Sequence, residues 1–116
     1  GKVCVSGQDA SVDGLRAVLS GDLSNTVYKA VKQEANAAAA LAVSLIKGTK
    51  AETNGFLNNV TGNPAKAAGA HNVPSVLLVP VGITARNVKV VIADGFQKKA
   101  DVCKGIEKLC TANGIK

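Results

Sequence analysis

The chain has 116 residues, the length of one domain, and its 47% of apolar residues can form a core although 3% are aromatic. Its net charge of +6 comes from lysines spread along the chain without interleaved aromatic residues, which disfavours nucleic-acid binding. No apolar run approaches the ~18 residues of a membrane-spanning helix, and no signal-peptide pattern is present. Because the sequence lacks methionine and begins at Gly1, we expect a processed chain or a part of a longer one.

The first quarter of the chain predicts two strands with a helix between them. Residues 2–6 read as a buried strand, and residues 24–28 are β-branched and aromatic enough for a second. The helix is predicted to begin at a cap provided by Ser11 or Asp13 and to end at Gly21.

A long helix and an irregular segment are predicted in the middle of the chain. The helix covers residues 31–47 and ends at Gly48. Its apolar positions follow the i, i+3, i+4, i+7 spacing of one helix face and comprise Ala38, Leu41, Ala42 and Leu45. Residues 48–73 lack periodicity and are rich in Gly, Asn, Thr, Ala and Pro, which indicates an exposed excursion.

The last part of the chain predicts a strand followed by short helices. The strand covers residues 73–84 and is interrupted by Pro80, which cannot donate a ladder hydrogen bond. Thr84 is predicted to cap a helix over residues 85–96, and residues 97–115 to form short helical pieces. This order predicts an α/β fold with a parallel sheet. Three strands are too few for a complete doubly wound sheet, so the chain has the pattern of a part of a larger α/β body.

The cysteines are informative about the compartment. Cys103 and Cys110 would lie about 10.5 Å apart on a straight helix, beyond the reach of a disulfide. Gly105 permits the chain to turn back between them, so the sequence favours a disulfide formed in an oxidising compartment, with two free thiols as the alternative. Cys4 lies within the first predicted strand and is expected to be a small buried apolar residue.

Motifs for catalysis, metals and phosphate are weak. Gly7, Gly14 and Gly21 match neither phosphate-loop pattern, and the one histidine, His71, falls in the irregular segment. Residues 59–61 fit a glycosylation sequon, a pattern that is common by chance. Without a nucleophile–base pair or a metal-ligand cluster, we expect no enzymatic activity and no cofactor.

Three polar residues follow the first two predicted strands, where α/β proteins form ligand sites. Gln8 and Asp9 come after the first strand, and Lys29 comes after the second. A carboxylate accepts from two neighbouring hydroxyls of a polyol, and an ammonium group donates from the far side. The alternative is that Asp9 caps the following helix and Lys29 is a solvated surface residue.

Three stretches of the chain resemble the C-terminal part of the periplasmic sugar-binding proteins of ABC importers, in particular their D-xylose-binding branch: VSGQDASVDGLRAVLSGDLSNTVYKAVKQEANAAAALAVSLIKG, VPSVLLVPVGITARNVKVVIADGF and KADVC. GQDA and TVYK at this spacing, followed by the alanine-rich helix and PVxxT, are specific as a set. The resemblance covers nearly the whole chain except residues 59–72.

The resemblance implies the type I periplasmic-binding-protein fold, in which two Rossmann-like lobes joined by three crossovers close on a monosaccharide. This chain would be a C-terminal fragment that contributes to both lobes. Residues 1–29 would belong to the C-terminal lobe, residues 30–80 to the N-terminal lobe after a hinge crossing, and residues 81–116 to the C-terminal lobe again, with the second crossing near Pro80–Thr84.

The same resemblance implies a function and its residues. Asp9 of GQDA would accept from sugar hydroxyls, with Gln8 beside it, and Lys29 of TVYK would be a polar ligand contact beside a hinge crossing. The protein would deliver an aldose such as xylose to a membrane permease, from the periplasm or from a tether outside a single membrane. The cysteine pair fits such a location. The alternative is a sugar-sensing domain of a regulator or of a chemotaxis input with the same fold.

The chain departs from the family in length, since family members are much longer. Most of the aromatic side chains on which sugars stack would therefore lie outside this chain, whose aromatic residues are Tyr28, Phe56 and Phe96. The selecting contacts would be absent with them, so the sequence does not distinguish a pentose from a hexose.

Overall fold

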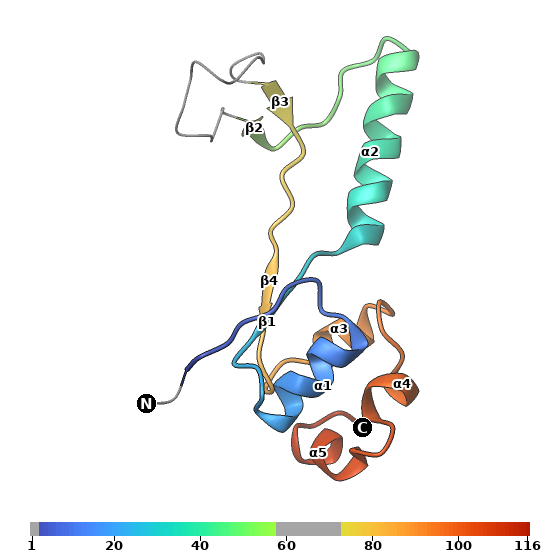
Figure 1. Ribbon diagram of the computed structural model, residues 1–116. Coiled ribbons are helices and arrows are strands. Elements are labelled where there is room, and N and C mark those ends of the chain that lie inside the picture. Colours follow the sequence, from blue (N-terminus) through green and yellow to red (C-terminus); the bar gives the residue numbers. More distant parts are fainter. Residues whose placement is uncertain (1–2, 58–72) are drawn as a thin grey trace. The chain divides into compact units, whose positions relative to one another are not determined.

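The computed structural model describes residues 3–57 and 73–116, which form two compact units (Figure 1). Unit 1 comprises Gly1–Ala30 and Pro80–Lys116, and unit 2 comprises Val31–Val79. The chain therefore leaves unit 1 after Ala30 and returns to it at Pro80. The assignment of these segments to two lobes remains a prediction.

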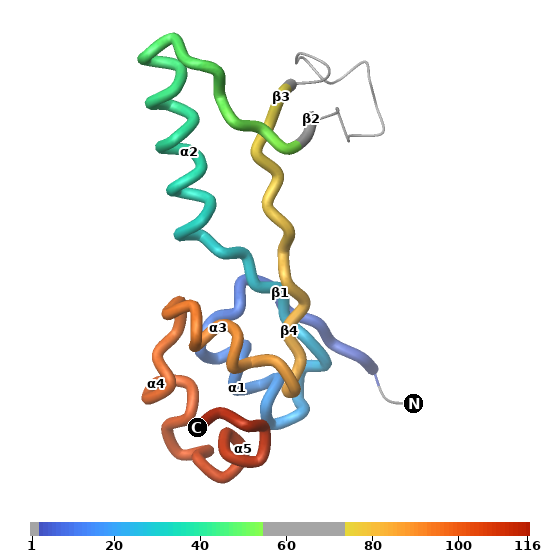
Figure 2. The backbone as a smooth tube through the Cα atoms, turned by 180° about the vertical axis from the view of Figure 1, so that it is seen from behind, coloured from blue at the N-terminus to red at the C-terminus, as the bar shows by residue number. Residues whose placement is uncertain are grey.

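Unit 1 contains two short strands and four helices: α1 (Val12–Ser20), β1 (Thr26–Tyr28), β4 (Val81–Ile83), α3 (Lys89–Ala93), α4 (Lys99–Cys103) and α5 (Glu107–Ala112). Both views place β1 and β4 side by side (Figures 1 and 2), and they pair antiparallel with Val27 opposite Gly82. The predicted parallel arrangement is wrong for these strands. Because β1 leads out of the unit and β4 leads back into it, neighbouring strands at this boundary run in opposite directions.

The segment before α1 forms a single parallel bridge instead of the predicted strand. Ser6 pairs with Asn25, and the Gly7 amide donates to the Asn25 carbonyl at 2.8 Å. Val3 is 87% exposed and Cys4 is exposed as well, so the prediction that Cys4 is buried is wrong. Regular strand structure requires continuous pairing along the segment, and the described residues provide it at one bridge only.

Helix α1 begins and ends as its sequence predicts. The Ser11 hydroxyl accepts from the Gly14 amide at 3.2 Å, which identifies Ser11 as the cap, and Gly21 ends the helix with a φ of 87°. Its buried residues Leu15, Val18 and Leu19 pack into the core of unit 1. The other large aliphatic side chains that are fully buried in this core are Ile83, Val88, Val91 and Val102.

The predicted disulfide between Cys103 and Cys110 is present. The two Cα atoms lie 5.9 Å apart because the chain turns at Gly105, whose φ is 75°. Closing a loop this short contributes at most about 2–3 kcal/mol. Backbone hydrogen bonds from Glu107 itself and from Gly105 lower the pKa of the Glu107 carboxyl.

Arg16 joins α1 to the end of α4. Its guanidinium donates to the carbonyls of Lys104 at 2.7 Å and Val102 at 3.2 Å. The last carbonyls of a helix have no partner within the helix, and a cation is favoured there by the helix dipole. Arg16 therefore links the end of α4 to α1.

Helix α3 is shorter than the helix predicted over residues 85–96. The Asn87 side chain accepts from the Thr84 amide at 2.7 Å, and the Asn87 amide donates to the Thr84 carbonyl at 3.1 Å. An asparagine that bonds nearby backbone groups competes with helix formation. The chain therefore turns over residues 84–88, and the prediction that Thr84 caps the helix is wrong.

Unit 2 contains α2 (Val31–Ile46) and an antiparallel pair, β2 (Gly55–Leu57) with β3 (Val73–Ser75). Helix α2 matches its prediction, but its half-buried face comprises Ala37, Leu41 and Ser44, one position away from the predicted face except at Leu41. Leu45, a member of the predicted apolar face, is 69% exposed, so this chain leaves that position uncovered. The interruption of the predicted strand at residues 73–84 is confirmed, since β3 and β4 are separate.

Residues 59–61 and His71 lie outside the described residues, so the expectations about the sequon and the histidine are not tested. Within residues 3–57 and 73–116, no helix has the length and apolar character to cross a membrane.

Candidate functional site

The candidate site is built on a tight turn over residues 7–10, between the Ser6 bridge and α1. Asp9 has a φ of 74° and Ala10 a φ of 45°, and among the described residues these are the two non-glycine positions with positive φ. Aspartate tolerates this conformation better than alanine, for which it costs about 1–2 kcal/mol. Such strain persists where neighbouring contacts fix the backbone, and it clusters at functional sites.

The contacts that fix this turn come from two other segments. The Ala10 amide donates to the Thr26 hydroxyl at 3.3 Å, and the Gln97 carboxamide donates to the Ala10 carbonyl at 3.2 Å. Ala10 and Thr26 are buried, so the bond between them is sheltered from water, while the bond from Gln97 is partly buried. At Gly7 a Cβ would lie 3.3 Å from the Leu23 side chain, and glycine allows this close approach. The turn is therefore bound to β1 and to the segment after α3.

Asp9 and Lys29 are brought together, as their places after the first two predicted strands suggested. The Lys29 ammonium lies 2.8 Å from the Asp9 carboxylate, and the two side chains are 46% and 69% exposed, respectively. An ion pair this exposed contributes little to stability, at most about 1 kcal/mol. Gln8 lies in the same turn and is exposed. The prediction that Asp9 could cap α1 is wrong, because Ser11 does so.

Tyr28, which precedes Lys29, contacts two residues that follow α3. Its hydroxyl donates to the Asp94 carboxylate, and its ring lies 5.1 Å from the Phe96 ring at an interplanar angle of 49°. Burial of the phenol and its hydrogen bond to Asp94 raise the pKa of Tyr28 from 10.0 to about 12. The end of β1 is thus fixed directly beside Lys29.

The protein should become less stable at alkaline pH because the pKa of Tyr28 is raised in the folded chain. Its pKa is higher in the folded chain than in the unfolded chain, so the folded state keeps the proton while the unfolded state releases it. The free energy of unfolding should therefore fall by roughly 2–3 kcal/mol as the pH rises from about 10 to about 12. Denaturant titrations over this range should show the loss in the wild type and a smaller loss in Tyr28→Phe. Equal losses in both proteins would contradict the assignment to Tyr28.

Sequence reasoning identified the charged pair but missed the residues that hold it. Thr26 lies in the TVYK stretch and could have been noticed as a hydroxyl on the strand next to the turn. Gln97 and Asp94 carry no such signal, because they lie 87 and 66 residues from their partners and follow no periodic pattern.

The chemistry of this site is that of opposite charges on a rigid, solvent-accessible frame. The carboxylate accepts hydrogen bonds and the ammonium donates them, and their charges offset, which suits an uncharged ligand rich in hydroxyls. The described ranges contain no group of three or more His, Cys, Asp or Glu residues that could hold a metal ion.

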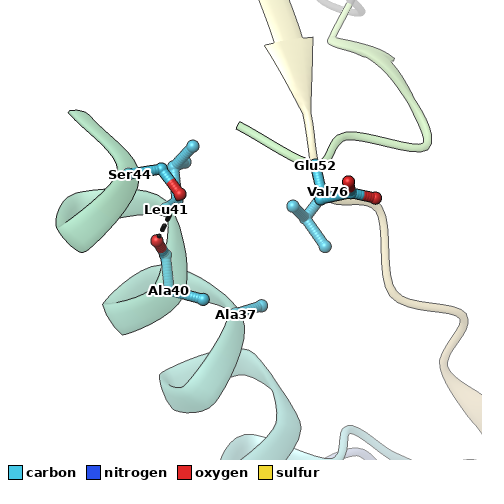
Figure 3. Close-up of a pocket in the computed structure, with 6 residues that line it drawn as sticks. All are labelled: Ala37, Ala40, Leu41, Ser44, Glu52 and Val76. Carbon is cyan, nitrogen blue, oxygen red and sulfur yellow. Dashed lines mark hydrogen bonds between the residues drawn. The ribbon is translucent and has the colours of Figure 1, made fainter. Parts of the chain in front are cut away.

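A pocket of about 180 Å³ lies within unit 2 and has a different character (Figure 3). Helix α2 lines one side with Ala37, Ala40, Leu41 and Ser44, while Glu52 and Val76 line the other. The Ser44 hydroxyl donates to the Ala40 carbonyl at 3.0 Å and so is already bonded within the helix. This mostly apolar hollow offers few polar groups to orient a ligand.

The chain is similar in sequence to known sugar-binding proteins. It is 40% identical over 103 residues to the D-xylose-binding periplasmic protein of Haemophilus influenzae and 39% identical to that of Escherichia coli, in each case over 88% of this chain and 28% of the relative. It thus spans a little more than a quarter of their length. No family model matches the chain.

The chain is also similar in structure to a solute-binding protein of a carbohydrate transporter from Chloroflexus aurantiacus, in complex with D-glucose. The TM-score is 0.70 at 29% identity, over 84% of this chain and 26% of that protein. These findings confirm the predicted resemblance and the type I fold, of which the chain covers about a quarter. The relatives are named as binding proteins and not as enzymes, in agreement with the prediction that the chain is no enzyme.

Proposed function

We propose that this homologue of periplasmic sugar-binding proteins forms one polar wall of a monosaccharide site in an extracytoplasmic receptor. Asp9 accepts hydrogen bonds from sugar hydroxyls, Lys29 donates to a sugar oxygen, and Gln8 contributes a carboxamide at the edge. The receptor delivers its sugar to an ABC permease, and it works in the periplasm or outside a single membrane.

The observation that carries this proposal is the exposed Asp9–Lys29 pair on its strained turn. The pair adds little to stability, yet the turn that presents Asp9 uses an unfavourable backbone conformation at two successive residues. Stability alone gives no reason to keep such a turn. A ligand that needs a carboxylate and an ammonium group in fixed positions would give such a reason.

Several features support a sugar as that ligand. A hydroxyl-rich, uncharged molecule can replace the direct ion pair by bridging the carboxylate and the ammonium, so that neither charge is left without a partner. The sequence relatives at 40% and 39% identity are named for D-xylose, which makes D-xylose the first candidate. Their names do not favour a sugar-sensing regulator.

Calorimetric titration of the full-length protein with a panel of monosaccharides tests the proposal. We expect D-xylose to bind most tightly, with D-glucose, L-arabinose and D-ribose weaker or without measurable heat. Sugar alcohols of equal hydroxyl number serve as controls for unspecific polyol binding. A protein that binds none of the sugars at millimolar concentration would contradict the proposed function, and a preference for D-glucose would contradict the choice of xylose alone.

A further inference from the structure

We propose that the segment Asp94–Gln97, which follows α3, positions both members of the Asp9–Lys29 pair. The inference rests on the proposed function, because it treats the pair as the polar wall of the sugar site. Three of the four residues contact an immediate sequence neighbour of Asp9 or Lys29. One short segment is therefore bonded to both halves of the site.

Gln97 acts on Asp9 through Ala10. Its carboxamide donates to the Ala10 carbonyl at 3.2 Å, while the Ala10 amide is held by the Thr26 hydroxyl at 3.3 Å. Both ends of this strained residue are thus fixed, and Asp9 is joined to it directly. Without the Gln97 bond, the peptide after Ala10 can rotate toward a less strained conformation and carry the Asp9 carboxylate with it.

Asp94 and Phe96 act on Lys29 through Tyr28. The hydroxyl bond to Asp94 and the ring contact with Phe96 fix the Tyr28 side chain under the end of β1. Lys29 then leaves the strand in a fixed direction and reaches Asp9 at 2.8 Å. Gly95, with a φ of 74°, allows the sharp turn that follows Asp94.

The test is a double-mutant cycle on D-xylose affinity in the full-length protein, with Gln97→Met as the central variant. Methionine keeps the length and volume of glutamine but cannot donate, so it removes the bond to Ala10 and leaves the packing. We expect about fivefold weaker binding in the wild-type background. In the Asp9→Gly background no carboxylate remains to be positioned, so the same substitution should have no effect. Lys98→Met, a similar change at the next residue, is the matched control and should bind as the wild type does.

Two results would overturn the positioning role. One is a Gln97→Met protein that binds xylose as tightly as the wild type. The other is an equal loss in both backgrounds, which would indicate general destabilisation. Tyr28→Phe, which keeps the ring contact but removes the hydroxyl, should likewise lose its effect in a Lys29→Ala background.

A measurement without sugar separates this inference from the proposed function. Hydrogen exchange of the Ala10 amide, followed by NMR, should be about fivefold faster in Gln97→Met than in the wild type or in Lys98→Met. An unchanged exchange rate would contradict the proposal that Gln97 fixes the turn, even if the wild type binds sugar. Faster exchange in Gln97→Met, together with a wild type that binds no sugar, would support the role of Gln97 in fixing the turn and contradict the proposed ligand.

Discussion

Asp9→Gly is expected to weaken D-xylose binding at least about a hundredfold, and Asp9→Asn about tenfold, with little change in stability. Hydrogen bonds to a charged acceptor contribute about 1.5–3 kcal/mol each, so removing a carboxylate that accepts two of them loses at least two orders of magnitude in affinity. Asparagine keeps the shape and one acceptor oxygen but not the charge. Dissociation constants from calorimetry, measured on the full-length protein, check both values.

The choice of substitutions follows from the backbone at this position. Asp9 has a φ of 74°, which asparagine and glycine adopt readily but alanine does not. Asp9→Ala would therefore add backbone strain to the loss of the carboxylate, and its effect on binding would mix the two causes. Asp9→Gly and Asp9→Asn avoid this strain.

Lys29→Ala is the companion variant and should lose less affinity than Asp9→Gly. Lysine has a flexible stem, and a water molecule can replace its ammonium as a donor. An Asp9→Gly protein that binds xylose within about threefold of the wild type, a difference of about 0.7 kcal/mol, would show that Asp9 is not a ligand.

Local signals in the sequence predicted the ends of α1 and α2. The serine cap at Ser11 and the glycine ends at Gly21 and Gly48 depend on a few neighbouring residues, so they can be read without knowing the fold. The same holds for the disulfide, since Gly105 permits the reversal between the cysteines. The prediction that Thr84 caps a helix was wrong because the Thr84 amide donates to the side chain of Asn87, three residues later, and the chain turns there.

Features that depend on distant segments could not be predicted in the same way. The order of strands and helices suggested a parallel sheet, but β1 and β4 are antiparallel because the chain leaves and re-enters unit 1 between them. Similarly, the spacing of Asp9 and Lys29 pointed to a common site, whereas the bond from Gln97 to Ala10 spans 87 residues and leaves no pattern. Hydrophobic periodicity predicts which face of a helix or strand is buried, but it does not predict which segment covers that face.

The exposed face of α2 shows the same limit. The spacing predicted an apolar face through Leu41 and Leu45 without showing what covers it, and Leu45 and Ile46 are 69% and 85% exposed within this chain. In a protein of the relatives' length, we expect further residues to cover this face. The apolar pocket beside Leu41 lies instead on the half-buried face of α2, which faces Glu52 and Val76.

Leu15→Ala should destabilise the protein by about 2–5 kcal/mol without lowering the sugar affinity of the folded fraction. Leu15 is fully buried between α1 and the core of unit 1, so truncation leaves a cavity and removes buried apolar area. The turn that carries Asp9 is fixed instead by the hydrogen bonds of Ala10 with Thr26 and Gln97, neither of which involves Leu15. Chemical denaturation gives the free energy of unfolding, and calorimetry under native conditions gives the dissociation constant.

Leu109→Ala is the matched control, because Leu109 lies in α5 of the same unit and is 38% exposed. Leu109→Ala should lower the free energy of unfolding by less than about 1 kcal/mol, since truncating a partly exposed leucine leaves no closed cavity. Together with the Asp9 variants, Leu15→Ala separates two contributions within unit 1. Aliphatic packing around Leu15 should set stability, and the hydrogen bonds to Ala10 should set affinity, although Ala10 lies in the same core cluster. If Leu15→Ala weakened xylose binding as much as Asp9→Gly does, the turn would depend on core packing, and the hydrogen bonds to Ala10 would not be what holds the site.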